Sequence, residues 1–322
     1  MVWSLRDFHS QRPFATLTTA RSKQIGEALQ IKDPAVDNRC ASCHAPLREV
    51  PENLHAHTFK VSEGISCESC HGPAESWLRT HTRPDYNHAD RVAIGMRDLK
   101  SLYVRANTCV ACHQTVALPL LKAGHPELMF ELDGQCVLEP RHWREATNWH
   151  GAQAWLVGQA AALREMSWQL SRSPAKDEKL AMRCDALLWV VSKLADLNSY
   201  FPELEVLGAQ SSAPNYRAVQ SSADLLAKRA SEASWSAAMT FSILNALAKS
   251  GADFRRPEVP AEQHARRADR LVLALDRLLA SLPEPSADTK LNELFKLSQS
   301  LPDFDPARFS AALDEFARVV GK

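Results

Sequence analysis

Apolar residues in the second half of the chain recur at the spacing of helices. Between residues 152 and 170 they fall at three- and four-residue steps, and similar runs occupy 179–200, 216–249 and 271–282. This period places the apolar side chains on one face of a helix. Glycine and proline separate the runs at 208–214, 251–260 and 283–285. We therefore predict a helical bundle with short connections, in which 216–249 forms one long helix or two short ones.

The first part of the chain has no sustained period, and prolines interrupt it repeatedly. This pattern predicts short helices joined by loops. Nowhere does the sequence show a strand pattern of any length. The predicted fold is mainly α, with an irregular N-terminal domain of short helices and loops at 1–140 and a C-terminal helical bundle domain at 141–322.

Six cysteines in the first part form three copies of the string Cys-x-x-Cys-His. The copies contain Cys40, Cys43 and His44; Cys67, Cys70 and His71; and Cys109, Cys112 and His113. In a c-type haem site the two thiols form thioether bonds to the porphyrin, and the imidazole binds the iron. With this composition, about 0.007 copies are expected by chance. The three strings predict three covalently bound haem c groups.

Other uses of paired cysteines fit these strings less well. Two Cys-x-x-Cys pairs could bind one zinc ion together, but the third pair would lack a partner. Zinc also gives no reason for a histidine after every second cysteine. A dithiol redox centre usually has a single motif. Disulfides within the pairs would leave the three histidines unexplained.

Each predicted haem has one ligand from its motif, which leaves the sixth iron position open. The free histidines that precede residue 130 are His9, His55, His57, His81, His88 and His125. His125 is the best distal candidate, because Gly124 beside it permits close approach to a porphyrin. His9 and His81 are the other candidates, with His57 and His55 as alternates. His88 is better explained as polar surface, and His142, His150 and His264 as structural residues.

Two further groups of residues have open roles. Five arginines between the second and third motifs either form a solvated face or pair with haem propionates: Arg79, Arg83, Arg91, Arg97 and Arg105. Cys136 and Cys184 lie outside any motif. In an oxidising compartment they could form a disulfide, and two separate buried thiols are the alternative.

Charge and hydropathy argue against two classes of protein, nucleic-acid binders and membrane-spanning proteins. The 322 residues include 38 Lys+Arg and 38 Asp+Glu, so the polypeptide is formally neutral. Three bis-histidine haems with ionised propionates would bring the total to about −3, which argues against nucleic-acid binding. No apolar run approaches the length of a membrane span. The first residues lack the pattern of a secretion signal, although haem attachment normally takes place outside the cytoplasm. We expect a periplasmic or otherwise extracytoplasmic protein whose N-terminal piece is missing from this sequence.

The segment 63–81 around the second motif resembles the multihaem cytochromes of the cytochrome c-554 type. Residues 7–10, Asp-Phe-His-Ser, and 123–132, which begin Ala-Gly-His-Pro, share this resemblance, which covers about 1–140. It implies an electron carrier with closely packed covalent haems, and distal ligation by His9, His81 and His125. The family usually carries four haems, the first attached before the segment like 7–10. No such motif is present, so a fourth haem would require an upstream segment.

The leading hypothesis is a multihaem cytochrome that transfers single electrons between redox proteins, as a carrier rather than an enzyme. One alternative is a haem redox enzyme that acts on a small nitrogen or oxygen compound at a five-coordinate iron. Another is that the helical half docks the haem part onto a partner oxidoreductase. We predict bis-histidine ligation, no nucleic-acid partner and no membrane span.

Overall fold

The computed structural model describes residues 2–145, 149–172, 177–211, 213–282, 287–299 and 303–321. The predicted break at 283–285 lies outside these ranges. Helices and turns account for the regular structure, and the described residues contain no strand. The prediction of a mainly α fold is confirmed.

The chain forms two compact units. The first, which we call the motif unit, comprises Met1–Met129 and Gln135–Thr147. The second, the helical unit, comprises Phe130–Gly134 and Asn148–Lys322. A five-residue segment that precedes the last part of the motif unit thus belongs to the core of the helical unit.

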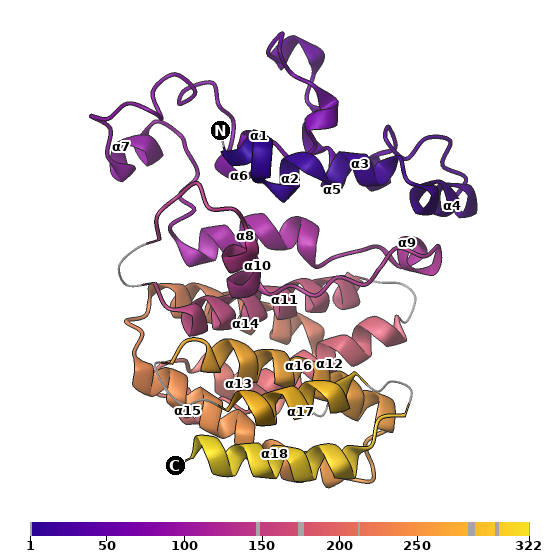
Figure 1. The fold of residues 1–322 in the computed structure, drawn as a ribbon, viewed down its shortest axis with the longest axis vertical. Helices are drawn as coiled ribbons and strands as arrows, with labels where there is room; N and C mark the ends of the chain where they lie inside the picture. The colour runs from indigo at the N-terminus through magenta and orange to yellow at the C-terminus, as the bar shows by residue number, and fades with distance from the viewer. Residues whose placement is uncertain are drawn as a thin grey trace. The chain divides into compact units, whose positions relative to one another are not determined.

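The motif unit consists of short helices and long connections (Figure 1). Its helices are α1 Val2–Arg6, α2 Phe8–Gln11, α3 Pro13–Leu17, α4 Ala20–Ala28, α5 Asn38–His44, α6 Cys67–His71, α7 His88–Ala93, α8 Leu102–His113 and α9 Leu118–Lys122. Three 3₁₀ turns lie between α5 and α6: η1 Pro46–Glu49, η2 Glu52–Leu54 and η3 Val61–Glu63. The helix α10, Leu132–Leu138, has residues in both units. Most of these helices are too short to bury a wide apolar face.

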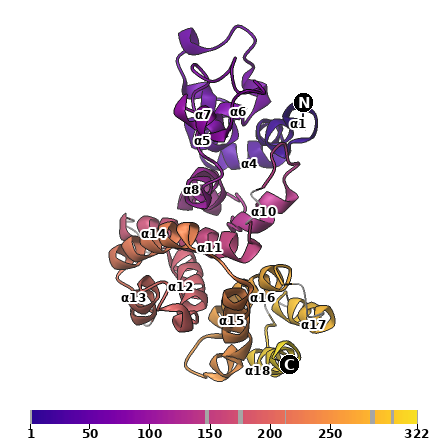
Figure 2. The same cartoon turned by 90° about the vertical axis from the view of Figure 1, so that its left-hand side faces the viewer.

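The helical unit contains longer elements that pack side by side. They are α11 Gly151–Arg172, α12 Glu178–Ser192, α13 Glu203–Ala209, α14 Tyr216–Glu232, α15 Ala237–Ala248, α16 Ala261–Leu279, α17 Asp288–Ser298 and α18 Pro306–Val320, with 3₁₀ turns η4 Ala195–Leu197 and η5 Lys249–Arg255. Helix α11 packs along α14 and contacts α12, while α15, α16, α17 and α18 form a second group (Figure 2). Helix α16 also contacts α12, which joins the two groups.

Region 216–249 is two helices. The break falls where Ala233 adopts an extended conformation and Ser236 caps α15, its side chain accepting a hydrogen bond from the backbone N–H of Met239. Serine at an N-cap satisfies a backbone donor that the helix leaves unpaired. This local signal separates the helices without a glycine or a proline.

The segment 130–134 is held tightly in the helical unit. Phe130 and Leu132 are fully buried. At Gly158 in α11, an added Cβ would lie 2.8 Å from the Cβ of Leu132, so the close packing requires glycine there. Glu131 accepts a hydrogen bond of 2.8 Å from Gln159 and lies 3.4 Å from the Arg270 guanidinium.

Candidate haem centres

Each Cys-x-x-Cys-His string lies on one helical turn whose last residue is the histidine. Helices α5, α6 and α8 end at His44, His71 and His113 respectively. Residues three and four apart lie on the same side of a helix, so both cysteines and the histidine of a copy can face one group. Helix α6 begins at Cys67 itself, and α5 begins at Asn38, two residues before Cys40. Asp37 and Ser66 cap the first turns of α5 and α6.

The third motif lies beside both of the others. The thiols of Cys43 and Cys112 share a hydrogen bond, which lowers the pKa of Cys43 to about 6 and raises the pKa of Cys112. The Arg97 side chain donates to the carbonyl oxygens of Ser69 (3.1 Å) and Cys70 (2.9 Å) in α6. It also lies 3.5 Å from the Thr108 hydroxyl in α8. The third motif therefore interacts with the first through Cys112, and Arg97 links α8 to α6.

The surroundings of the three motif histidines disfavour the charged imidazolium. Burial lowers the pKa of His71 to about 4 and also lowers the pKa values of His44 and His113. A histidine must be neutral at the ligating nitrogen to bind a metal ion. Their surroundings thus favour the protonation state that iron ligation requires.

Each motif histidine has a second histidine close enough for one metal ion to bind between the two rings. The ring centres are 5.9 Å apart for His9 and His113, and 6.5 Å apart for His125 and His44. A metal–imidazole bond is about 2 Å long, so two imidazoles on opposite sides of one metal ion have ring centres about 6 Å apart. The observed spacing fits an iron ion between the rings of each pair.

The second motif has a different neighbour from the one that the sequence favoured. The ring of His142 lies 6.0 Å from that of His71. His81 lies 5.4 Å from the ring of Trp77, and the Trp77 ring in turn lies 6.2 Å from His71. The sequence alone predicts a structural role for His142, because this residue lies near the helical half. Its position beside His71 arises from a long-range return of the chain, which no local sequence pattern signals.

Hydrogen bonds leave Nε2 available in three of the candidate ligands. Nδ1 lies 2.8 Å from the carbonyl oxygen of Pro13 in His44, of Pro126 in His125 and of Leu78 in His81. Such a bond fixes the tautomer and turns Nε2 toward a metal. Glycine at 124, with φ +104°, permits the backbone turn that precedes His125.

Three other histidines show the opposite pattern. Nε2 is the bonded nitrogen in His55, 3.2 Å from the Leu47 carbonyl oxygen, and in His88, 3.0 Å from a carboxylate oxygen of Asp98. His264, in the helical unit, likewise bonds through Nε2 to the carbonyl oxygen of Arg256 at 3.1 Å. His57 is exposed. These contacts make ligation through Nε2 less favourable for His55 and His88.

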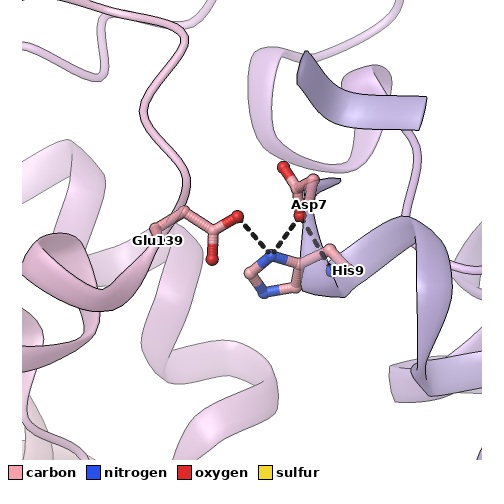
Figure 3. A group of neighbouring side chains, drawn as sticks. All are labelled: Asp7, His9 and Glu139. Atoms are coloured by element: carbon pink, nitrogen blue, oxygen red, sulfur yellow. Dashed lines mark hydrogen bonds and ion pairs between the residues drawn. The ribbon is translucent and has the colours of Figure 1, made fainter. Parts of the chain in front are cut away.

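His9 is held by two carboxylates (Figure 3). Its Nδ1 lies 3.2 Å from Asp7 Oδ1 and 3.4 Å from Glu139 Oε1, the second contact being longer than a well-formed hydrogen bond. The contact with Glu139 is the main cause of a raised pKa at His9, while burial acts in the opposite direction. The other ring nitrogen is on the far side from the carboxylates.

The arginines between the second and third motifs have protein partners at four of five positions. Arg83 forms an ion pair with Asp85, Arg91 donates to the His81 carbonyl oxygen, and Arg97 binds α6 as described above. Buried Arg105 forms a two-bond ion pair with Glu145, at 2.8 and 3.1 Å. Arg79 is exposed. The cluster is thus largely occupied in holding the backbone of the motif unit.

Cys136 and Cys184 are both buried, and neither forms a disulfide in the part of the chain that the structure describes. The sulfur of Cys136 lies 3.8 Å from Arg105 Nη1, and that of Cys184 lies 3.6 Å from the Ser167 hydroxyl.

Buried polar atoms near the motifs support a missing polar or metal-bearing group. Among the described residues, His71 Nδ1, Trp77 Nε1 and both amide atoms of Gln114 are buried without a hydrogen-bond partner. Leaving such an atom unpaired costs about 1–3 kcal/mol. Together with the histidine pairs and the facing cysteines, these atoms indicate that the residues present fit covalent haem.

Comparison with known proteins agrees with this chemistry for the first part of the chain. Residues 2–72 match the family described as cytochrome c554 and c-prime, which supports a c-type cytochrome with covalently bound haem. No curated protein and no solved structure matches the chain. Within the described ranges, every helix is too short or too polar to cross a membrane.

Proposed function

We propose that the protein is a multihaem c-type cytochrome that passes single electrons between other redox proteins. Haem c would be attached at Cys40 and Cys43, at Cys67 and Cys70, and at Cys109 and Cys112. When bound, each haem supplies a one-electron iron couple. The match to a c-type cytochrome family over residues 2–72 supports the coarse assignment.

The observation that carries the proposal is that every motif histidine has a second imidazole about 6 Å away. We propose the ligand pairs His44 with His125, His71 with His142, and His113 with His9. Two histidines per iron leave no open position for a substrate and favour electron transfer over substrate chemistry. His81 then remains a further imidazole near the second site.

The arrangement of the motifs supports a connected relay. The third motif contacts the first through Cys112 and Cys43, and Arg97 connects it to the second. We propose that the third site is central and that the order in space is first, third, second. Electron entry and exit would then occur at sites one and two, with a redox protein as the partner at each end.

We also propose an extracytoplasmic location, because covalent haem attachment normally takes place there. The helical unit has no assigned chemistry in this scheme, and a role in docking a partner oxidoreductase is compatible with it.

The proposal is tested on the mature protein. We expect three haems per chain by pyridine haemochrome assay and intact mass, and three low-spin ferric signals by electron paramagnetic resonance. A haem count below three, or a high-spin haem that binds nitric oxide or peroxide in the unaltered protein, would contradict the carrier and favour the enzyme.

Paired variants separate the two candidates for the second site. His142→Ala should convert one of the three haems to high spin, because His71 loses its neighbour across the iron. His81→Ala should leave all three low-spin. The reverse result would assign the ligand to His81, as the family resemblance implies.

A further inference from the structure

We propose that Asp7 and Glu139 act together as tuning residues that lower the reduction potential of the third haem. The inference rests on the proposed function, with His9 as a ligand of that haem. It adds a role for two carboxylates that would not themselves touch the iron.

The two acids approach one ring nitrogen from distant parts of the chain (Figure 3). Asp7 directly precedes α2, and its Oδ1 accepts a 2.8 Å hydrogen bond from the His9 backbone N–H and lies 3.2 Å from His9 Nδ1. Glu139 follows α10 and lies 3.4 Å from the same nitrogen. Convergence from residues 7 and 139 requires the folded motif unit, so the contact is a product of tertiary structure.

The surroundings strengthen the effect of these charges. The Asp7 side chain is 5% exposed and that of Glu139 is 16% exposed. Hydrogen bonds and charges act more strongly where water is largely excluded. Nδ1 has a single proton to donate, and Asp7 is the closer acceptor. Glu139 places a second carboxyl group next to the same ring.

The expected direction follows from the chemistry of the ligand. A carboxylate that accepts the Nδ1–H bond increases the electron donation of the imidazole through its other nitrogen. Greater donation and nearby negative charge both favour ferric over ferrous iron, which lowers the reduction potential. At the first site the corresponding partners of His44 and His125 are the neutral carbonyl oxygens of Pro13 and Pro126. The carboxylate pair therefore distinguishes the third site from the first.

Spectroelectrochemistry of the fully loaded protein tests the inference. In Asp7→Asn and in Glu139→Gln, one of the three one-electron steps should shift to higher potential, and the double variant should shift it further. Asparagine also caps helices well, so the start of α2 is preserved. The other two steps should keep their potentials. Glu52→Gln, an exposed acid of the same unit, removes the same charge as a control and should shift none of the steps.

Two results would overturn the inference. One is a set of three unchanged potentials in both variants, with the low-spin signals of the parent protein retained. The other is a divalent cation bound at one per chain in addition to iron and lost in Asp7→Asn, since among the described residues Asp7, His9 and Glu139 offer ligand atoms within 4.8 Å of one another. Failure of the proposed function would be distinct, because the unaltered protein would then lack three low-spin haems.

Discussion

The interiors of the two units are built from different kinds of side chain. In the described residues, the largest fully buried side chains all belong to the helical unit, among them Trp155, Phe254 and Phe309. Around the cysteine strings of the motif unit lie half-buried imidazoles and thiols, together with buried unpaired polar atoms such as those of Gln114. A core of closely packed apolar side chains is stable without a cofactor. The motif unit has no such core of large, fully buried side chains among its described residues, which agrees with the proposal that haem completes it.

The largest effect is expected when haem is withheld. If all six motif cysteines are replaced by serine in the full chain, the motif unit should lose its protection from trypsin, because its short helices have little apolar core of their own. The helical unit should retain its far-UV circular dichroism and its resistance to cleavage. If both units of this variant resisted trypsin equally, the motif unit would not depend on haem for its stability.

A substitution in the core of the helical unit should destabilise that unit and leave the haem sites unchanged. Leu156→Ala removes a fully buried side chain from α11 and should lower the free energy of unfolding of the helical unit by about 2–5 kcal/mol. The haem absorption spectrum should stay unchanged. Leu225→Ala is the matched control, because Leu225 is largely exposed on α14 and its loss should cost less than about 0.5 kcal/mol. Denaturant unfolding followed by circular dichroism measures both.

A smaller effect concerns pH and the helical unit. Burial raises the pKa of Glu131 to about 7, and Arg270 opposes the shift. Between its unfolded and folded pKa values the folded protein keeps a proton that the unfolded chain has lost, so stability falls as pH rises through this range. Since 16% of the Glu131 side chain is exposed, we expect a loss of about 1–2 kcal/mol between about pH 5 and about pH 8.

Glu131→Gln should remove this contribution and flatten the curve of unfolding midpoint against pH. Glutamine retains the shape and an acceptor for Gln159. An unaltered slope in the variant would mean that Glu131 is ionised in the folded unit throughout this range.

The sequence predicted those features that depend on local spacing. A period near 3.6 identified the helices of the second half, and the cysteine strings identified candidate haem attachment sites. Region 216–249 stayed ambiguous because its break depends on the capping serine at 236 and not on glycine or proline. The sequence predicted a structural role for His142 and not a place beside His71, because the approach of the two rings is a tertiary contact. Glu139 drew no attention in the sequence, because its contact with His9 joins residues far apart in the chain.

The end of each attachment helix at its own histidine also bears on how such chains can diversify. Because each string is complete within one turn, the residues between strings can lengthen, shorten or change without altering the geometry inside any of them. A copy can be gained or lost as a module, and the remaining copies then need new distal partners rather than new attachment sites. Differences among chains built in this way would accordingly lie more in the scattered histidines than in the strings.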